Sequence, residues 1–403
     1  MTGGLLQLVA SGVQDSYLIG NPQITFFKVV YRRHTNFAKE SVRQFFTTRP
    51  DYGRILNCTI SRDGDLLQDI YLEINLPTIA TGNTYVYGVG NALIKKVELE
   101  IGGQLIDRHY SEWLNIWEEL NCYPGHRVGL DEMVGNSPSN LTGGRLYVPL
   151  QFWFNKRPGL ALPLAALHKH EVRLHFEIRE NTSLVFSNSN TLVAAPAITG
   201  DDFIRVYADY IYLDGEERQR FTQLPIEYLI EQVQFNGDEH YPGNTNNNFA
   251  GTKLSKTSLN FINPIKELIW VYTKDTITDS YNRFFNFSNS GVNVFSTGML
   301  VLDGIDMQTE RDADYFLLEE NWKHHTNIPR YSSPFNQCIY TYSFALKPEE
   351  HQPSGFCNFS RLNEASLVIT YPYLTSDWTL KVYATNYNIF RIMDGMGGLI
   401  YTK

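Results

Sequence analysis

The chain has 403 residues and a formal net charge of −9 at pH 7. This acidic balance gives no overall field that attracts polyanions, which excludes a protein that binds nucleic acid through its general surface charge. Aromatic residues make up 14% of the chain and charged residues only 19%; because aromatic and β-branched side chains fit half-buried pleated surfaces, the composition predicts a mostly β protein.

The first 25 residues form a predicted arm, apolar but too short to be a domain. The first Lys or Arg is Lys28, so the positive region of a signal peptide is missing and no export is expected. No run of about 18 apolar residues occurs, which argues against an ordinary membrane-spanning helix. The four cysteines are scattered and form no C-x-x-C, so we expect free thiols and neither a disulfide framework nor a zinc ribbon.

The run GNPQITFFKVVYRRHTNFA, residues 20–38, mixes aromatic side chains with a basic pair. In an extended chain Phe27 and Tyr31 would lie on one side, and apolar residues would lie on the other side too. We therefore predict a first strand that lies between other elements. No second cationic cluster accompanies Arg32 and Arg33, so a nucleic-acid patch is not expected.

Period-two alternation recurs along the rest of the chain. In HEVRLHFEI, residues 170–178, four apolar residues alternate with charged or polar ones, which indicates one buried and one solvent-facing side. Gly, Pro, Asn and Ser clusters separate similar runs, a rhythm typical of a β-sandwich or barrel. The other predicted strands are residues 97–101, 146–154, 203–213, 227–235, 266–273, 339–346, 365–371 and 379–390.

Two short helices are predicted between the strands. Residues 111–120 place four large apolar side chains on one face, with Ser111 as a plausible N-cap. Residues 312–322 place Tyr315, Leu318 and Trp322 at similar spacing. Each helix follows a strand and a turn and precedes two further strands, so the same order of elements occurs twice, about 200 residues apart.

This duplication predicts two β-domains, at 26–215 and 216–403, after the arm at 1–25. The hinge falls near LDGEERQRFTQLP, residues 213–225, whose charged centre cannot be a buried strand. Long polar loops at 135–144, 186–202, 236–252 and 287–293 invite a functional interpretation. Residues 394–400, DGMGGLI, are interpreted as a C-terminal turn.

Candidate chemistry is sparse. His168 and His170 would share one face of a strand while His175 would point the other way, so the three cannot meet at one metal without a bulge. The carboxylate pairs Glu349/Glu350 and Glu216/Glu217 lie in loop-like stretches and are interpreted as solvated surface. No nucleophile elbow, zinc-protease motif, phosphate loop or dinucleotide fingerprint occurs. We expect no catalytic, metal or cofactor site, and no enzyme.

Five N-x-S/T sequons occur in this Asn-rich chain, and without an export signal they are expected to be chance matches. They begin at Asn57, Asn140, Asn181, Asn286 and Asn358.

Three separated blocks of sequence resemble the major capsid proteins of nucleocytoplasmic large double-stranded DNA viruses, the group of iridoviruses, chloroviruses and mimivirus relatives. The blocks are GGLLQLVASGVQDSYLIGNPQITFFKVVYRRHTNFA at the start, LDGEERQRF and EYLIEQVQ at the hinge, and NYNIFRIMDGMGGLIYT at the end. The resemblance covers essentially the whole chain. It implies an all-β fold of two tandem eight-stranded jelly-roll sandwiches, a double jelly roll, with short helices in the loops.

The resemblance also implies a function. Homotrimers would form pseudo-hexagonal capsomers that tile an icosahedral shell, assembled in the host cytoplasm. Expected partners are further copies of the chain, minor capsid and penton proteins, and a nearby inner viral membrane, without direct contact to nucleic acid. The arm would pack under the trimer or against neighbouring shell components, which would bury its large apolar residues. These residues are Leu5, Leu6, Leu8, Val9, Tyr17, Leu18 and Ile19.

Two other hypotheses remain open from the residues alone. A carbohydrate-binding β-sandwich would use loop aromatics, Tyr241, Phe249 and Phe295, as binding platforms. A hydrolase on a sandwich scaffold is weaker, because no acid, base or metal constellation can be assembled at credible spacing.

Overall fold

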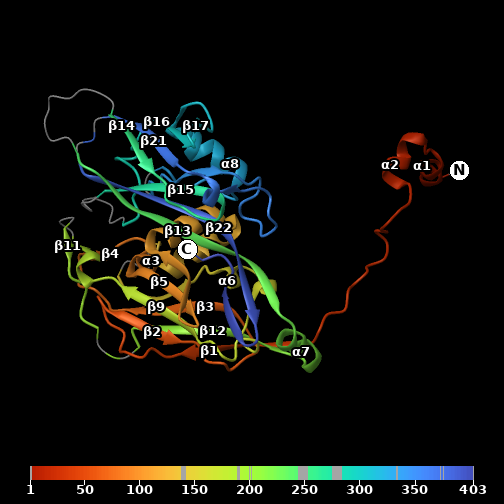
Figure 1. Ribbon diagram of the computed structural model, residues 1–403, viewed down its shortest axis with the longest axis horizontal. Helices are drawn as coiled ribbons and strands as arrows, with labels where there is room; N and C mark the ends of the chain where they lie inside the picture. The colour runs from red at the N-terminus through yellow and green to blue at the C-terminus, as the bar shows by residue number, and fades with distance from the viewer. Residues whose placement is uncertain are drawn as a thin grey trace. The chain divides into compact units, whose positions relative to one another are not determined.

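The structure is a computed structural model (Figure 1). It describes residues 2–137, 142–187, 191–198, 200, 202–243, 253–274, 284–332, 335–372, 374 and 376–402. The chain divides into two units, Met1–Asn36 and Phe37–Lys403, and each is described by itself.

The unit Met1–Asn36 contains three short helical segments followed by irregular chain. The segments are α1 (Gly3–Val9), η1 (Val13–Asp15) and α2 (Ser16–Ile19). Residues 20–36 contain neither helix nor strand, and the Phe27 side chain is 97% exposed. The strand predicted in residues 20–38 is therefore wrong as far as Asn36. Ladder pairing within the chain starts only at Phe37, which lies opposite Leu213.

The first sandwich of the unit Phe37–Lys403 has two main antiparallel sheets, stacked in Figure 1, and a small third one. The larger sheet has the order β1 (Phe37–Gln44), β12 (Ile204–Leu213), β3 (Leu66–Leu76), β7 (Gly144–Pro149), with β8 (Leu162–Pro163) also on β3. The opposing sheet has the order β2 (Ile55–Thr59), β9 (Val172–Ile178), β5 (Ile94–Ile101), β6 (Gln104–Tyr110). The small sheet has the order β11 (Leu192–Val193), β10 (Val185–Ser187), β4 (Asn83–Tyr85).

The second sandwich repeats this two-sheet plan. One sheet has the order β13 (Ile226–Tyr241), β22 (Trp378–Met393), β15 (Pro264–Lys274), β19 (Tyr340–Ser343), with β20 (Cys357–Asn358) on β15 and β23 (Met396–Leu399) on β22. The other has the order β14 (Lys253–Ser258), β21 (Ala365–Tyr371), β16 (Thr297–Leu302), β17 (Ile305–Asp306), with β18 (Arg311–Asp312) on β16. In the described ranges, every ladder joins strands of the same sandwich.

Strand burial follows the predicted alternation. In β9, Val172, Leu174, Phe176 and Ile178 are buried and the residues between them are not, because one face of the sheet covers the core and the other meets solvent. Strand β15 differs, since its residues are buried on both faces from Ile265 to Tyr272. The other predicted strands lie within a few residues of observed ones, except that residues 146–154 leave the sheet after Pro149.

Short helices and helical turns occupy the connections, as Figure 1 shows for several of them. They are α3 (Val89–Leu93), α4 (Ser111–Asn121), η2 (Pro124–His126), α5 (Arg127–Val134), α6 (Trp153–Lys156), η4 (Pro158–Leu160), η5 (Asn181–Ser183), α7 (Gly215–Gln223), η6 (Tyr315–Glu319), α8 (Glu320–His324) and η7 (Phe359–Arg361). The predicted hinge at 213–225 is largely the helix α7. None of the described helices is both long and apolar enough to span a membrane.

Both predicted helices form, but two details were wrong. The N-cap of α4 is Tyr110, while Ser111 lies inside the first turn, where its hydroxyl donates to Glu112. The helix predicted at 312–322 begins as the π-helical η6. Because a π turn takes up an extra residue, it rotates the following side chains. Phe316 and Leu317 are therefore buried, and Trp322 is 70% exposed.

Candidate functional site

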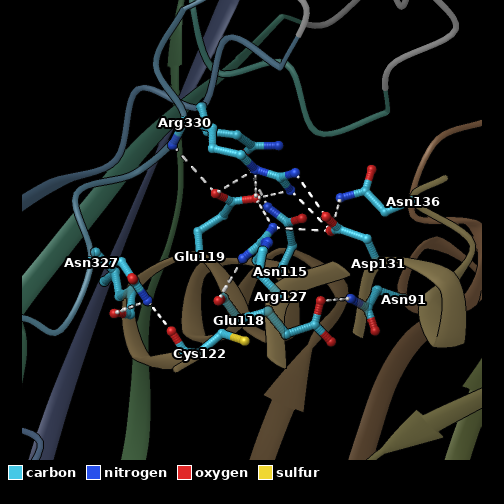
Figure 2. A network of polar contacts seen from close by, with 12 residues as sticks. Asn91, Asn115, Glu118, Glu119, Cys122, Arg127, Asp131, Asn136, Asn327 and Arg330 are labelled. Atoms are coloured by element: carbon cyan, nitrogen blue, oxygen red, sulfur yellow. Dashed lines mark hydrogen bonds and ion pairs between the residues drawn. The ribbon is translucent and has the colours of Figure 1, made fainter. Parts of the chain in front are cut away.

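A polar network joins the first sandwich to the second (Figure 2). Helix α4 provides Glu119, whose side chain is 1% exposed, and α5 provides Asp131. Arg330, from the second sandwich, donates from Nη2 to Glu119 Oε1 at 2.7 Å and from Nη1 to Asp131 Oδ2 at 2.9 Å. The guanidinium also lies over the Phe335 ring, 3.7 Å from its centroid. Forked, charge-assisted bonds are directional, so Arg330 orients one sandwich against the other.

Arg127 completes this network from the first sandwich. Its guanidinium donates to the backbone oxygen of Glu118 at 2.7 Å and also binds Glu119 and Asp131. Two arginines thus face two largely buried carboxylates, and their charges balance. Such a group is sensitive to truncation, because removing one partner leaves the opposite charge buried without compensation.

Glu118 lies beside the network and is almost completely buried. It accepts a hydrogen bond from Asn91 Nδ2 at 2.8 Å. Burial raises the pKa of Glu118 to about 8; Asn91 and Arg127 oppose the rise, and the charges of Glu119 and Asp131 add to it. Glu118 is therefore mainly protonated at neutral pH. The other amide atom of the same residue, Asn91 Oδ1, is buried and has no hydrogen-bond partner among the described residues.

The C-terminal end of α4 is completed by the second sandwich. The last carbonyls of a helix have no partner within the helix. Asn327 of the second sandwich supplies these partners. Its backbone N donates to Leu120 O at 3.0 Å, and its side-chain amide donates to the carbonyls of Leu120 and Cys122. Earlier in the helix, Asn115 Nδ2 donates to Gln337 Oε1 at 3.0 Å.

Ion pairs between lysines and buried glutamates connect the two sandwiches at two further places. Glu231 on β13 accepts from Lys156 on α6 at 3.0 Å and from Lys266 on β15 at 2.9 Å. Burial alone would raise the pKa of Glu231, but the two lysines lower it to about 2. Lys381 on β22 binds Glu112 on α4 at 2.8 Å, and the lysine keeps the pKa of Glu112 low despite burial.

The C-terminal hairpin also binds the first sandwich. Lys169 N donates to Gly395 O at 3.0 Å, and His170 Nδ1 lies 3.0 Å from Gly397 O. Gly395 has φ of +84°, and a Cβ there would lie 2.4 Å from the His168 ring. The predicted turn at 394–400 is thus a turn at Asp394–Gly395 followed by the strand β23.

A cavity of about 1170 Å³ lies where the sandwiches meet. Its lining includes the aromatic side chains Trp113, Trp117 and Tyr123. The lining also includes Asp69 on β3 and Asp209 on β12, from the larger sheet of the first sandwich. Three further charged lining residues already form ion pairs, since Lys156 and Lys266 both bind Glu231.

The histidines weighed as ligands have other contacts. His168 and His170 precede β9 and lie at the C-terminal hairpin, as described above, so neither is in the strand. His175 lies in β9 with its ring nitrogens 2.7 Å from Asn57 Oδ1 and 3.2 Å from Glu100 Oε2. In the part of the chain that the structure describes, no three His, Cys, Asp or Glu side chains are grouped to hold a metal.

Two interpretations of surface residues are corrected. Tyr241 and Phe295, expected as exposed sugar-binding platforms, are 5% and 2% exposed because they pack in the core of the second sandwich; Phe249 lies outside the described residues. Glu349, expected to be solvated, is partly buried and binds His325 at 3.1 Å. Burial would raise the pKa of Glu349, but hydrogen bonds from His325 and Thr326 lower it.

The other three glutamates of the two carboxylate pairs were also expected to be solvated and to lie in loops. Glu350 pairs with Lys347, and both are exposed. Glu216 and Glu217 lie in the first turn of α7, which is a helix where a loop was expected.

The residues expected to make assembly contacts all lie in the unit Met1–Asn36. Their side chains are exposed in the single chain, from 52% at Leu5 to 92% at Tyr17; the others are Leu6, Leu8, Val9, Leu18 and Ile19. Of the sequon residues, Asn57 is exposed, while Asn181, Asn286 and Asn358 are half-buried and Asn140 lies outside the described residues.

Sequence reasoning missed the junction residues, above all Glu119, Asp131 and Arg330. One signal was present: the pair Glu118–Glu119 sits in the apolar helix pattern of residues 111–120, where a buried acid needs a partner. The identity of that partner, some 200 residues away, could not be deduced from spacing.

Comparison with known proteins gives consistent results. Residues 25–214 match the family model described as major capsid protein N-terminus, and residues 217–398 match the model described as large eukaryotic DNA virus major capsid protein. The major capsid protein of Pyramimonas orientalis virus is 42% identical and that of Paramecium bursaria Chlorella virus 1 is 39% identical, each with all of both chains covered.

Solved structures agree with the fold. The VP54 protein of PBCV-1 has a TM-score of 0.82 and 34% identity, covering 94% of this chain and 100% of that one. The Faustovirus major capsid protein, at 13% identity, shares the fold with a TM-score of 0.74, covering 92% of this chain and 93% of that one. The two sandwiches are accordingly a double jelly roll. The chain therefore belongs to the major capsid proteins of large eukaryotic DNA viruses and is a component of the virion capsid.

Proposed function

We propose that three copies of this chain form a homotrimeric, pseudo-hexagonal capsomer and that such capsomers tile an icosahedral shell. Two jelly rolls per chain would give six lobes around a three-fold axis, so a trimer approximates a hexagonal tile. The division into lobes at 26–215 and 216–403 is supported by the described ladders, which stay within one sandwich or the other. The jelly roll suits this role because its packed double sheets leave few open strand edges.

The observation that carries the proposal is the buried junction between the sandwiches. A tile must keep a fixed shape, and Arg330, Glu119 and Asp131 hold the two lobes in one arrangement. Two lobes that move against each other are expected to share a small interface whose polar groups stay hydrated. Here the contact includes nearly fully buried charges, such as Glu231 between its two lysines.

The arm supplies the second part of the proposal. It would pack beneath the trimer or against neighbouring shell proteins, including minor capsid and penton proteins, and would bury the leucines that the single chain exposes. The arm has no Lys or Arg before Lys28, which supports a position away from nucleic acid, beside an inner membrane. Assembly would take place in the host cytoplasm, and the role requires no catalysis and no cofactor.

Light scattering after size-exclusion chromatography tests this proposal. The purified full-length chain should elute with three times the 46.3 kDa mass of one chain and remain a trimer at micromolar concentration. A stable monomer under these conditions would overturn the proposal.

A further inference from the structure

The cavity lining includes two acids that form no ion pair with a described residue. Asp69 on β3 and Asp209 on β12 lie directly opposite each other in the ladder. Like charges in that position destabilise a sheet. Neither side chain has an ion pair or side-chain hydrogen bond with another described residue, and Asp209 Oδ1 is buried without a partner. Lys39, whose charge acts on Asp69, donates to Gln68 at 2.7 Å.

Tyrosines surround this acidic pair. Tyr71 and Tyr207 stack with ring centroids 5.3 Å apart, and Tyr147 lies 6.5 Å from Tyr71. Arginine and lysine bind favourably where carboxylates and aromatic faces occur together. Burial and the charge of Asp209 raise the pKa of Asp69 to about 6, although the charge of Lys39 opposes the rise. The surroundings are thus suited to a basic side chain from outside this unit.

Residues 26–34, FFKVVYRRH, have the complementary chemistry. Phe26, Phe27 and Tyr31 are 83% to 97% exposed. Lys28, Arg32 and Arg33 form no ion pair with any residue the structure describes. A monomeric protein rarely leaves so many aromatic and apolar side chains in water, and a contiguous exposed set of this kind marks an interaction site.

We propose that the cavity receives residues 26–34 of a second copy of the chain, with Arg32 and Arg33 beside Asp69 and Asp209 and the aromatic residues of the segment against the aromatic part of the lining. This inference rests on the proposed trimer, and it gives the segment that follows the arm a place in that trimer. The cavity, at about 1170 Å³, exceeds the usual range of small-molecule pockets, roughly 300 to 1,000 Å³, and suits a peptide segment.

The local sequence favours a second copy over the segment's own chain. To reach its own sheet face, the segment would have to reverse direction just before β1 begins at Phe37. A tight reversal usually needs Gly, Pro, Asn or Asp in the turn. Between Pro22 and Phe37 the chain has no Gly, no further Pro and no Asp, and its one Asn, Asn36, adjoins the strand. An extended exit toward a neighbour requires no such turn.

Charge reversal tests the contact in the full-length protein. Arg32→Glu with Arg33→Glu should weaken trimer association at least tenfold, measured by mass photometry across a dilution series. Asp69→Asn with Asp209→Asn should weaken it similarly, and combining all four changes should add little, because both pairs remove the same contact. Lys253→Glu with Arg361→Glu, at exposed sites on the second sandwich, is a control with the same charge change.

Cysteine pairing distinguishes a second copy from the same chain. One tagged chain carries Tyr31→Cys and a differently tagged, co-expressed chain carries Tyr147→Cys; a disulfide between the two tags is expected, and Lys253→Cys in place of Tyr147→Cys should give none. Disulfides formed only within a chain that carries both substitutions would overturn the inference. The inference would also be overturned if the Arg32→Glu, Arg33→Glu protein formed trimers as stable as those of the control. Either result leaves the proposed trimer standing, whereas a monomeric wild-type protein would refute the trimer as well.

Discussion

Replacing Glu118 by Gln should stabilise the protein at alkaline pH. Glu118 is buried and accepts a hydrogen bond from Asn91, and its pKa in the folded chain is about 8 against an ordinary value of 4.5. The folded state thus prefers the protonated acid. The contribution of Glu118 to the free energy of unfolding is therefore fully present below pH 4.5 and is lost as the pH rises through 8. Gln imitates the protonated acid, because it is uncharged, has nearly the same shape, and keeps an oxygen that can accept from Asn91 Nδ2.

The size of the effect follows from the two pKa values. Each pKa unit corresponds to about 1.4 kcal/mol, so the shift amounts to at most about 5 kcal/mol of unfolding free energy between acid and alkaline pH. Guanidinium unfolding of wild type and Glu118→Gln at pH 5, 7 and 9 measures it. The two proteins should be similar at pH 5, and the variant should be more stable by several kcal/mol at pH 9 (about 3 to 5).

Exposed Glu216 on α7 provides the control, since Glu216→Gln should leave the pH dependence unchanged. The reasoning would be refuted if Glu118→Gln kept the wild-type pH dependence, or if it were less stable than wild type at pH 9.

Three further predictions concern the junction and the helix after β18. Arg330→Ala should lower the unfolding free energy by about 3 to 5 kcal/mol at pH 7, because it leaves two largely buried carboxylates, Glu119 and Asp131, facing the single cation of Arg127; a loss below about 1 kcal/mol in denaturant unfolding would contradict this. Glu231→Gln should cost about 3 kcal/mol at neutral pH, and the difference from wild type should vanish as pH falls from 4.5 toward 2, because the folded-state pKa is low; a constant difference in acid titrations would count against it. Phe316→Ala should cost about 3 to 5 kcal/mol and Trp322→Ala less than about 1 kcal/mol, and the reverse order of melting temperatures would argue against the π-helical register.

Much of the fold could be predicted from local pattern. Strand β9 follows from simple alternation, because one buried face imposes a period of two on the sequence. The amphipathic helix at 111–120 was equally visible. The repeated order of strand, helix and further strands is present in the structure as β5, α4, β7 and β9, and again as β16, α8, β19 and β21. These features depend on residues that lie close together in the sequence, so one sequence is enough to predict them.

The errors arose where distant contacts decide the outcome. Residues 20–36 have strand-like composition, but a strand needs a partner for its backbone, and this unit offers none. The apolar face at 315–322 was misplaced because a π turn changes the helical period. Arg330 could not be assigned to Glu119 because nothing near either residue reports a contact across 211 positions.

Electron microscopy of the purified full-length protein tests the central claim most directly. If two locked jelly rolls per chain build the shell's tile, class averages viewed down the three-fold axis should show six lobes in a pseudo-hexagonal outline. Particles with only two lobes, or oligomers in which the two lobes of a chain vary in relative position, would contradict the account.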